Sequence, residues 1–164
     1  KAITTTADQF KINLSVIKSV VKSNKNRSSI LLKRAIKLLN GKIKNKKICF
    51  LGVTFKANTD DMRDSSSLTM IPLLAKKGAK INYYDPTGYK TEFSKYKNVT
   101  FSKDIKSAMY KSDLIIIHTE WNDFKSINFK SIMKNKKYII FDMRNIYSQT
   151  KMKQLKINYF CVGG

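Results

Sequence analysis

Cations, carboxylates and hydroxyls gather in one stretch of the chain, Gly52 to Leu68, with the sequence GVTFKANTDDMRDSSSL. Two isolated cations, Lys56 and Arg63, lie among three aspartates, and three serines follow them. A lysine attracts phosphate as a point charge, whereas an arginine offers a planar fork that binds phosphate through two hydrogen bonds. The stretch therefore indicates an anion-binding loop. The alternative is a solvated loop whose cations pair with its own aspartates.

This stretch joins an apolar strand, expected over residues 47–51, to an apolar helix, expected over residues 66–77. Strand, loop and helix in this order open a βαβ unit. Ligands of open α/β sheets bind beyond the carboxyl ends of the strands, so the loop lies at the end where a ligand binds. It lacks the Gly-x-Gly-x-x-Gly of a dinucleotide site, because only Gly52 is present. Side chains must therefore hold any bound anion.

Strands and helices alternate through the rest of the chain. Five further strands are expected over residues 80–84, 99–101, 113–118, 137–141 and 157–162, with helices near residues 88–96 and 104–111. The wholly apolar run 114–117 is typical of a parallel strand that is covered on both faces. The pattern predicts an α/β fold with a doubly wound, six-stranded parallel Rossmann-like sheet in the order 3-2-1-4-5-6.

Side chains that can do chemistry also follow three later strands. His118 is the only histidine, and without a paired nucleophile or metal ligand we expect it to be packed rather than to act as a base. Trp121 is expected to plug the loop rather than to stack on a base. Asp85 is expected to cap a turn rather than to bind a ribose. Arg144 either pairs with Asp142 or reaches a sugar or phosphate at the switch point of the sheet.

One long helix is expected from Ala7 to Asn40, a range without Pro or Gly. Apolar residues recur along it in steps of four and three, at Phe10, Leu14, Ile17, Val21, Leu31, Ala35 and Leu38. Such a helix would span about 50 Å, which is too long for one small domain to bury. We therefore expect it to connect two bodies or to dimerise. The alternative is a surface helix packed on its own sheet.

Composition narrows the classes of function. The net charge of +22 comes from 33 cations, but only four are arginines, which leaves 29 lysines spread along the chain. Sequence-specific nucleic-acid binding relies on arginine, so only weak attraction to polyanions is expected. No apolar run is long enough to span a membrane. Cys49 and Cys161 lack metal or redox spacing, which predicts core residues in a reducing, cytoplasmic protein.

Residues 52–65 match the pattern G-x-x-F-K-x-x-T-D-D-x-R-x-S, and this resembles the signature of the UDP-glucose/GDP-mannose dehydrogenase family. Three further matches follow strands in the expected order: Tyr84-Asp85-Pro86, Thr119-Glu120-Trp121 and Asp142-Met143-Arg144-Asn145. Four matched strand ends are far more specific than a single glycine-rich loop. The resemblance covers about two thirds of the chain and extends to the UDP-binding domain and the central helix before it.

The resemblance implies that the full enzyme oxidises UDP-glucose to UDP-glucuronate with two NAD. A cysteine thiolate would capture the intermediate aldehyde between the two hydride transfers. On the matching positions, Phe55, Lys56 and Arg144 are implied to contact the UDP-sugar. Arg63 is implied to reach NAD held by another domain. A small residue usually stands where this chain has Met143, which affects the expected reach of Arg144.

The family's Gly-Gly-Ser-Cys-Phe-Pro-Lys-Asp nucleophile motif and glycine-rich NAD site do not occur in this sequence. We therefore expect a fragment in which residues 1–41 form the connecting and dimerising helix and residues 42–164 form the UDP-sugar-binding domain. It would contain no catalytic residue and no metal site, and it would be inactive without an N-terminal NAD-binding half. The alternatives are a stand-alone or decayed binding or scaffold module, and a related UDP-N-acetylmannosamine or GDP-mannose dehydrogenase.

Overall fold

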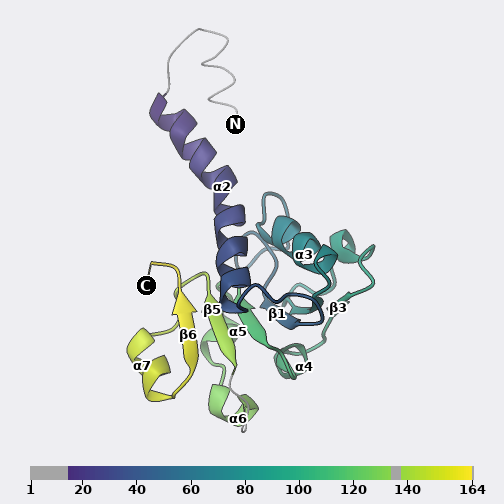
Figure 1. The fold of residues 1–164 in the computed structure, drawn as a ribbon, viewed down its shortest axis with the longest axis vertical. Helices are drawn as coiled ribbons and strands as arrows, with labels where there is room; N and C mark the ends of the chain where they lie inside the picture. Colours follow the sequence, from purple (N-terminus) through teal and green to yellow (C-terminus); the bar gives the residue numbers. More distant parts are fainter. Residues whose placement is uncertain (1–14, 134–137, 164) are drawn as a thin grey trace.

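The computed structural model describes residues 15–133 and 138–163 and forms an α/β fold around one six-stranded sheet (Figure 1). The strands are β1 (Lys47–Leu51), β2 (Lys80–Tyr84), β3 (Val99–Phe101), β4 (Leu114–Ile117), β5 (Ile139–Asp142) and β6 (Asn158–Cys161). They lie in the order β3-β2-β1-β4-β5-β6, and all neighbouring pairs are parallel. The predicted doubly wound sheet and its strand order are confirmed.

Helices cover both faces of this sheet. They are α2 (Ser15–Leu38), α3 (Ser67–Lys76), α4 (Ile105–Met109), α5 (Asn122–Lys125), α6 (Phe129–Met133) and α7 (Gln149–Gln154), with a short 3₁₀ turn, η1 (Thr91–Phe93). Of the short helix predicted near residues 88–96, only this 3₁₀ turn forms. The backbone N–H of Lys90 donates to the Tyr83 hydroxyl at 2.8 Å, which ties the segment to β2 by a contact that sequence periodicity does not show.

Alternation along the strands divides the core into two halves. On β1, Ile48 and Phe50 pack on the side of α2 and α3, while Cys49 and Leu51 pack on the side of α4 to α7. All four residues of β4 are buried, as predicted for a strand covered on both faces. The predicted core positions of Cys49 and Cys161 are also confirmed, since both thiols are free and buried.

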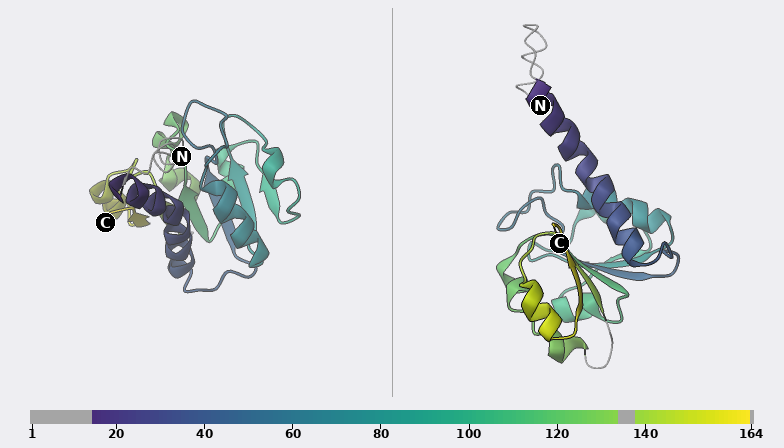
Figure 2. Two further views of the ribbon diagram at one scale, coloured as in Figure 1. Left: turned by 90° about the horizontal axis from the view of Figure 1, so that it is seen from above. Right: turned by 60° about the vertical axis from the view of Figure 1, so that its left-hand side comes forward.

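Only the C-terminal part of α2 packs on the domain, and the rest projects away from it (Figures 1 and 2). Leu31, Leu32 and Ala35 are buried, whereas Ile30 is 62% exposed. Leu39, just beyond the helix, is buried where the predicted stripe placed Leu38, which is only half-buried. The part of the predicted helix over residues 7–14 lies outside the described residues. The alternative of a surface helix packed on its own sheet therefore applies only to the last turns of α2.

No helix within residues 15–133 and 138–163 has the length and apolar character that crossing a membrane requires.

Candidate functional site

The loop from Gly52 to Ser66 leaves β1 through a contact that only glycine permits. Gly52 has φ of +77°, and a Cβ on it would lie 2.5 Å from the Cβ of Thr119. Its N–H donates to Tyr84 O at 2.8 Å, which places the start of the loop between β2 and β4. The absent side chain lets the loop backbone lie directly against the segment that follows β4.

Asp85 fixes the next two residues of the loop. Its carboxylate is buried, and Oδ2 accepts hydrogen bonds from the N–H groups of Val53 and Thr54 at 2.8 and 3.3 Å. Oδ1 accepts from the N–H and hydroxyl of Thr87 at 3.0 and 2.5 Å. Both oxygens are therefore occupied by protein donors. This confirms the capping role predicted for Asp85 and leaves it no capacity to bind a ribose.

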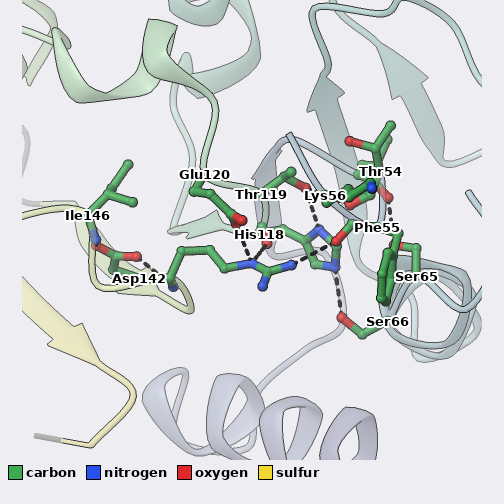
Figure 3. A network of polar contacts seen from close by, with 12 residues as sticks. Thr54, Phe55, Lys56, Ser65, Ser66, His118, Thr119, Glu120, Asp142 and Ile146 are labelled. Atoms are coloured by element: carbon green, nitrogen blue, oxygen red, sulfur yellow. Dashed lines mark hydrogen bonds and ion pairs between the residues drawn. The ribbon is translucent and has the colours of Figure 1, made fainter. Parts of the chain in front are cut away.

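His118 joins the end of β4 to the loop and to the start of α3 (Figure 3). Its Nε2 lies 2.8 Å from Ser66 Oγ and its Nδ1 lies 3.0 Å from Thr119 Oγ1. The Thr119 hydroxyl donates its single proton to Thr54 O at 2.8 Å. Nδ1 must therefore carry the imidazole proton, and Nε2 accepts from Ser66.

Burial and, to a smaller extent, the nearby Arg144 charge lower the pKa of His118 to about 3. The ring is only 1% exposed, so it is neutral and inaccessible at physiological pH. The expectation of a packed histidine is confirmed, and His118 positions the surrounding groups rather than acting as a general base.

Arg144 is the cation that the backbone carbonyls of His118 and Phe55 hold. Its Nε donates to His118 O at 2.8 Å, and its Nη2 donates to Phe55 O at 3.0 Å. Nε also lies 2.9 Å from Glu120 Oε2, which forms the ion pair of this side chain. The predicted alternative partner, Asp142, contacts Arg144 only through the backbone N–H of Arg144. Glu120 is the site residue that sequence reasoning missed, although it stands inside the matched Thr-Glu-Trp motif.

Asp142 builds the turn that carries Arg144. The carboxylate is buried and accepts from the N–H groups of Arg144 and Ile146 at 2.9 and 2.8 Å and from the Tyr159 hydroxyl at 2.8 Å. Met143 buries its side chain in the core on the α2 side. The turn thus accommodates Met143 and presents Arg144 beside Phe55.

Phe55 and Lys56 are exposed residues of the loop next to Arg144. Phe55 is 47% exposed, and its N–H donates to Asp61 O at 2.8 Å, which closes the tip of the loop. The Lys56 ammonium has no ion pair with another residue of the described ranges, although its charge helps to lower the pKa of Asp61. The structure thus brings together three of the four predicted site residues: Phe55, Lys56 and Arg144.

Arg63 is separate from these three. Its Nε and Nη2 each lie 2.9 Å from an oxygen of Asp61, while its side chain is 90% exposed. Hydrogen bonds from Arg63 lower the pKa of Asp61 to about 2. The ion-paired alternative thus describes Arg63 in this structure. Its contact with NAD stays a prediction.

The remaining candidate groups are structural. Trp121 is 8% exposed, which confirms the predicted plug. Cys49 is fully buried, and burial raises the pKa of its thiol far above the ordinary value, so it cannot serve as a thiolate nucleophile. Gln149 Nε2 donates to the buried Cys161 sulfur at 2.8 Å. Within the described ranges, no cluster of three or more His, Cys, Asp and Glu side chains could hold a metal ion.

These features agree with the comparisons to known proteins. A family model described as "UDP-glucose/GDP-mannose dehydrogenase family, UDP binding domain" matches residues 49–149, which contain all four strand ends described above. The chain belongs to this family. The resemblance expected from the sequence is thereby confirmed.

Curated relatives from the dehydrogenase family extend the match over nearly the whole chain. UDP-glucose 6-dehydrogenase of Rickettsia felis is 33% identical over 99% of this chain, and the Rhizobium meliloti enzyme is 32% identical over the same share. UDP-glucose 6-dehydrogenase YwqF of Bacillus subtilis is 32% identical, also over 99% of the chain. The chain spans 37% of the length of each of these relatives.

Solved structures of dehydrogenases share the fold. A UDP-glucose dehydrogenase from Pyrobaculum islandicum superposes with a TM-score of 0.73 at 21% identity, covering 86% of this chain and 31% of the solved one. A UDP-N-acetylmannosamine dehydrogenase from Pyrococcus horikoshii gives a TM-score of 0.73 at 24% identity, covering 96% of this chain and 35% of the solved one. At these identities the likeness establishes the fold, and the choice of sugar rests on other observations.

Proposed function

We propose that this chain is the UDP-binding part of a nucleotide-sugar dehydrogenase and that its ligand is UDP-glucose. The observation that carries the proposal is the convergence of Arg144 with Phe55, beside Lys56, at the switch point between β1 and β4. The matched UDP-binding family model supports the nucleotide. The names of the 32–33% identical relatives support glucose as the sugar.

In this proposal each residue does a different part of the binding. Two backbone carbonyls hold the Arg144 fork in place before the ligand arrives, which lowers the conformational cost of gripping a phosphate. Lys56 adds an exposed point charge on a flexible stem. The half-exposed Phe55 ring offers an apolar surface to the uracil or the sugar.

NAD, when bound, would accept the hydride from the substrate. The described residues can contact NAD but do not form its main binding site, because the β1 loop lacks the glycine pattern that lets a backbone approach a pyrophosphate. Arg63 is 90% exposed and can turn from Asp61 towards an anion outside this domain. We therefore propose that the main NAD site lies in an N-terminal half of the enzyme. The two halves together would form the complete dehydrogenase, which would act in the cytoplasm.

Calorimetry with UDP tests the binding site. Lys56→Ala should weaken UDP binding about ten- to a hundredfold, because a hydrogen bond to a charged group contributes about 1.5–3 kcal/mol. Lys97→Ala is the matched control, since this lysine is also exposed but lies outside the loop. Its loss should be far smaller, because solvent and salt screen scattered charges. Equal small losses in both variants would show generic attraction to polyanions and would contradict the proposed site.

A second part of the proposal is that residues 1–41 connect the two halves and form a homodimer. The N-terminal part of α2, which projects from the domain (Figure 1), supports it, and so does Ile30, which is 62% exposed although the adjacent Leu31 is buried. Sedimentation at moderate salt should show a dimer or a larger species. Ile17→Asp with Val21→Asp should shift it towards monomer while the sheet stays folded. A wild-type chain that is monomeric at about 100 µM, where micromolar contacts would be occupied, would contradict dimerisation.

The chain alone should not oxidise UDP-glucose, because both of its cysteines are buried. The measurement is NADH production at high protein concentration. Turnover that disappears on substitution of Cys49 or Cys161 would overturn this part of the proposal.

A further inference from the structure

The ion pair between Arg144 and Glu120 has an unusual geometry. Arg144 Nε carries one hydrogen, and it donates this hydrogen to His118 O at 2.8 Å. Glu120 Oε2 lies 2.9 Å from the same nitrogen. This oxygen is screened from solvent, yet it accepts no hydrogen bond from the described residues. Glu120 therefore balances the charge of Arg144 without a hydrogen bond to it.

The orientation of the guanidinium comes from other groups. His118 O and Phe55 O accept hydrogen bonds from two nitrogens of the Arg144 guanidinium. The buried Asp142 accepts from the backbone N–H of Arg144. These acceptors remain when the Glu120 carboxylate is removed. The Glu120 side chain is itself 41% exposed, so it can turn towards water when another anion approaches.

We propose that Glu120 is an internal counter-ion that competes with ligand phosphate for Arg144 and thereby lowers the affinity of the site for anions. A phosphate can use N–H groups of Arg144 that Glu120 leaves unbonded, so it replaces a bare charge contact with hydrogen bonds. The competition keeps binding weaker than the cation alone would make it, which favours release of the nucleotide. The identity of the phosphate as part of a UDP-sugar rests on the proposed function.

A double-mutant cycle of Glu120→Gln and Arg144→Gln tests this role by calorimetry with UDP, inorganic pyrophosphate and uridine. Glu120→Gln should tighten UDP and pyrophosphate binding by about tenfold, equivalent to about 1.4 kcal/mol. The gain should shrink as salt is raised. Uridine affinity should not change, because uridine carries no phosphate. In the Arg144→Gln background the gain should disappear.

Glu92→Gln is the matched control, since it removes the same charge from an exposed glutamate that has no contact with Arg144. It should leave all three affinities unchanged. Glu120→Ala is measured as a second variant, with thermal unfolding of each protein, and it should reproduce the gain because loss of the charge decides the effect. A purely structural role for Glu120 would instead weaken all ligands alike and lower the unfolding temperature.

The outcomes separate this inference from the proposed function. A gain in pyrophosphate binding that requires Arg144, in a chain that binds UDP no better than pyrophosphate, would support the counter-ion and refute the UDP site. Wild-type binding of UDP that Glu120→Gln leaves unchanged or weakens would overturn the counter-ion and leave the UDP site standing. Equal gains in the Glu92→Gln and Glu120→Gln variants would overturn it as well, since they would show a net-charge effect.

Discussion

Acidification should destabilise the folded chain through His118, the only histidine in the sequence. The imidazole is 1% exposed, and both ring nitrogens have partners, Ser66 and Thr119. A proton on Nε2 would point at the hydrogen of the Ser66 hydroxyl, so Nε2 would have no acceptor unless that hydroxyl rotated. Burial and the Arg144 charge together lower the pKa of His118 from 6.5 to about 3.

The sign follows from linkage between protonation and folding. The unfolded chain takes up a proton near pH 6.5, whereas the folded chain takes it up only near pH 3, so stability is complete above pH 6.5 and falls as the pH drops towards 3. Each pH unit in this window costs about 1.36 kcal/mol. Between about pH 7.5 and 5 the free energy of unfolding should therefore fall by about 2 kcal/mol.

Urea unfolding at several pH values between about 7.5 and 5 measures this loss, and aspartates contribute little there because their ordinary pKa lies near 3.9. His118→Gln should be less stable at neutral pH, but its stability should change little across this range. A wild-type free energy of unfolding that is flat down to pH 5 would refute the argument. A slope that persists unchanged in His118→Gln would assign it to other groups and refute it too.

Two further predictions concern the aspartates of the site. Asp85→Asn should lower the free energy of unfolding, measured with urea, by about 3 kcal/mol, because one amide oxygen cannot satisfy the buried donors on both sides. Asp104→Asn at the N-cap of α4 is the control and should cost little, since asparagine caps a helix equally well. Similar losses in the two variants would contradict the reasoning. By carbon-detected NMR, the Asp61 carboxyl should titrate with a midpoint near pH 2, so its contribution to stability is present above about pH 3.8 and is lost as the pH falls through 2. Arg63→Gln should raise the titration midpoint of Asp61 towards 3.8. A midpoint that does not move would mean that the ion pair is absent in solution.

The sequence by itself determined the sheet. The bounds of β1, β2 and β3 agree with the predicted ranges, and β4 was recognised as a strand covered on both faces. These features depend on local apolar patterns and on the handedness of crossovers, which act along consecutive residues. The loop after β1 was also found from sequence, because its charges and its family pattern are contiguous.

Short elements were harder to predict. The helices α5, α6 and α7 have four, five and six residues, too few to show a helical period. Of the helix expected near residues 88–96, only the 3₁₀ turn η1 forms, and the N–H of Lys90 at its start donates to the Tyr83 hydroxyl. Interactions across the fold outweigh local propensity in such segments.

Only the tertiary structure decided which partners the site residues have. Arg144 meets the carbonyl of Phe55 across a separation of 89 residues, and His118 meets Ser66 across 52. From the sequence, Asp142 is a candidate partner for the Arg144 side chain and Glu120 has no role, because a separation of two residues is visible in a sequence and proximity across neighbouring strands is not. The parallel sheet places the ends of β1, β4 and β5 side by side, and this proximity brings distant motifs into one charged cluster.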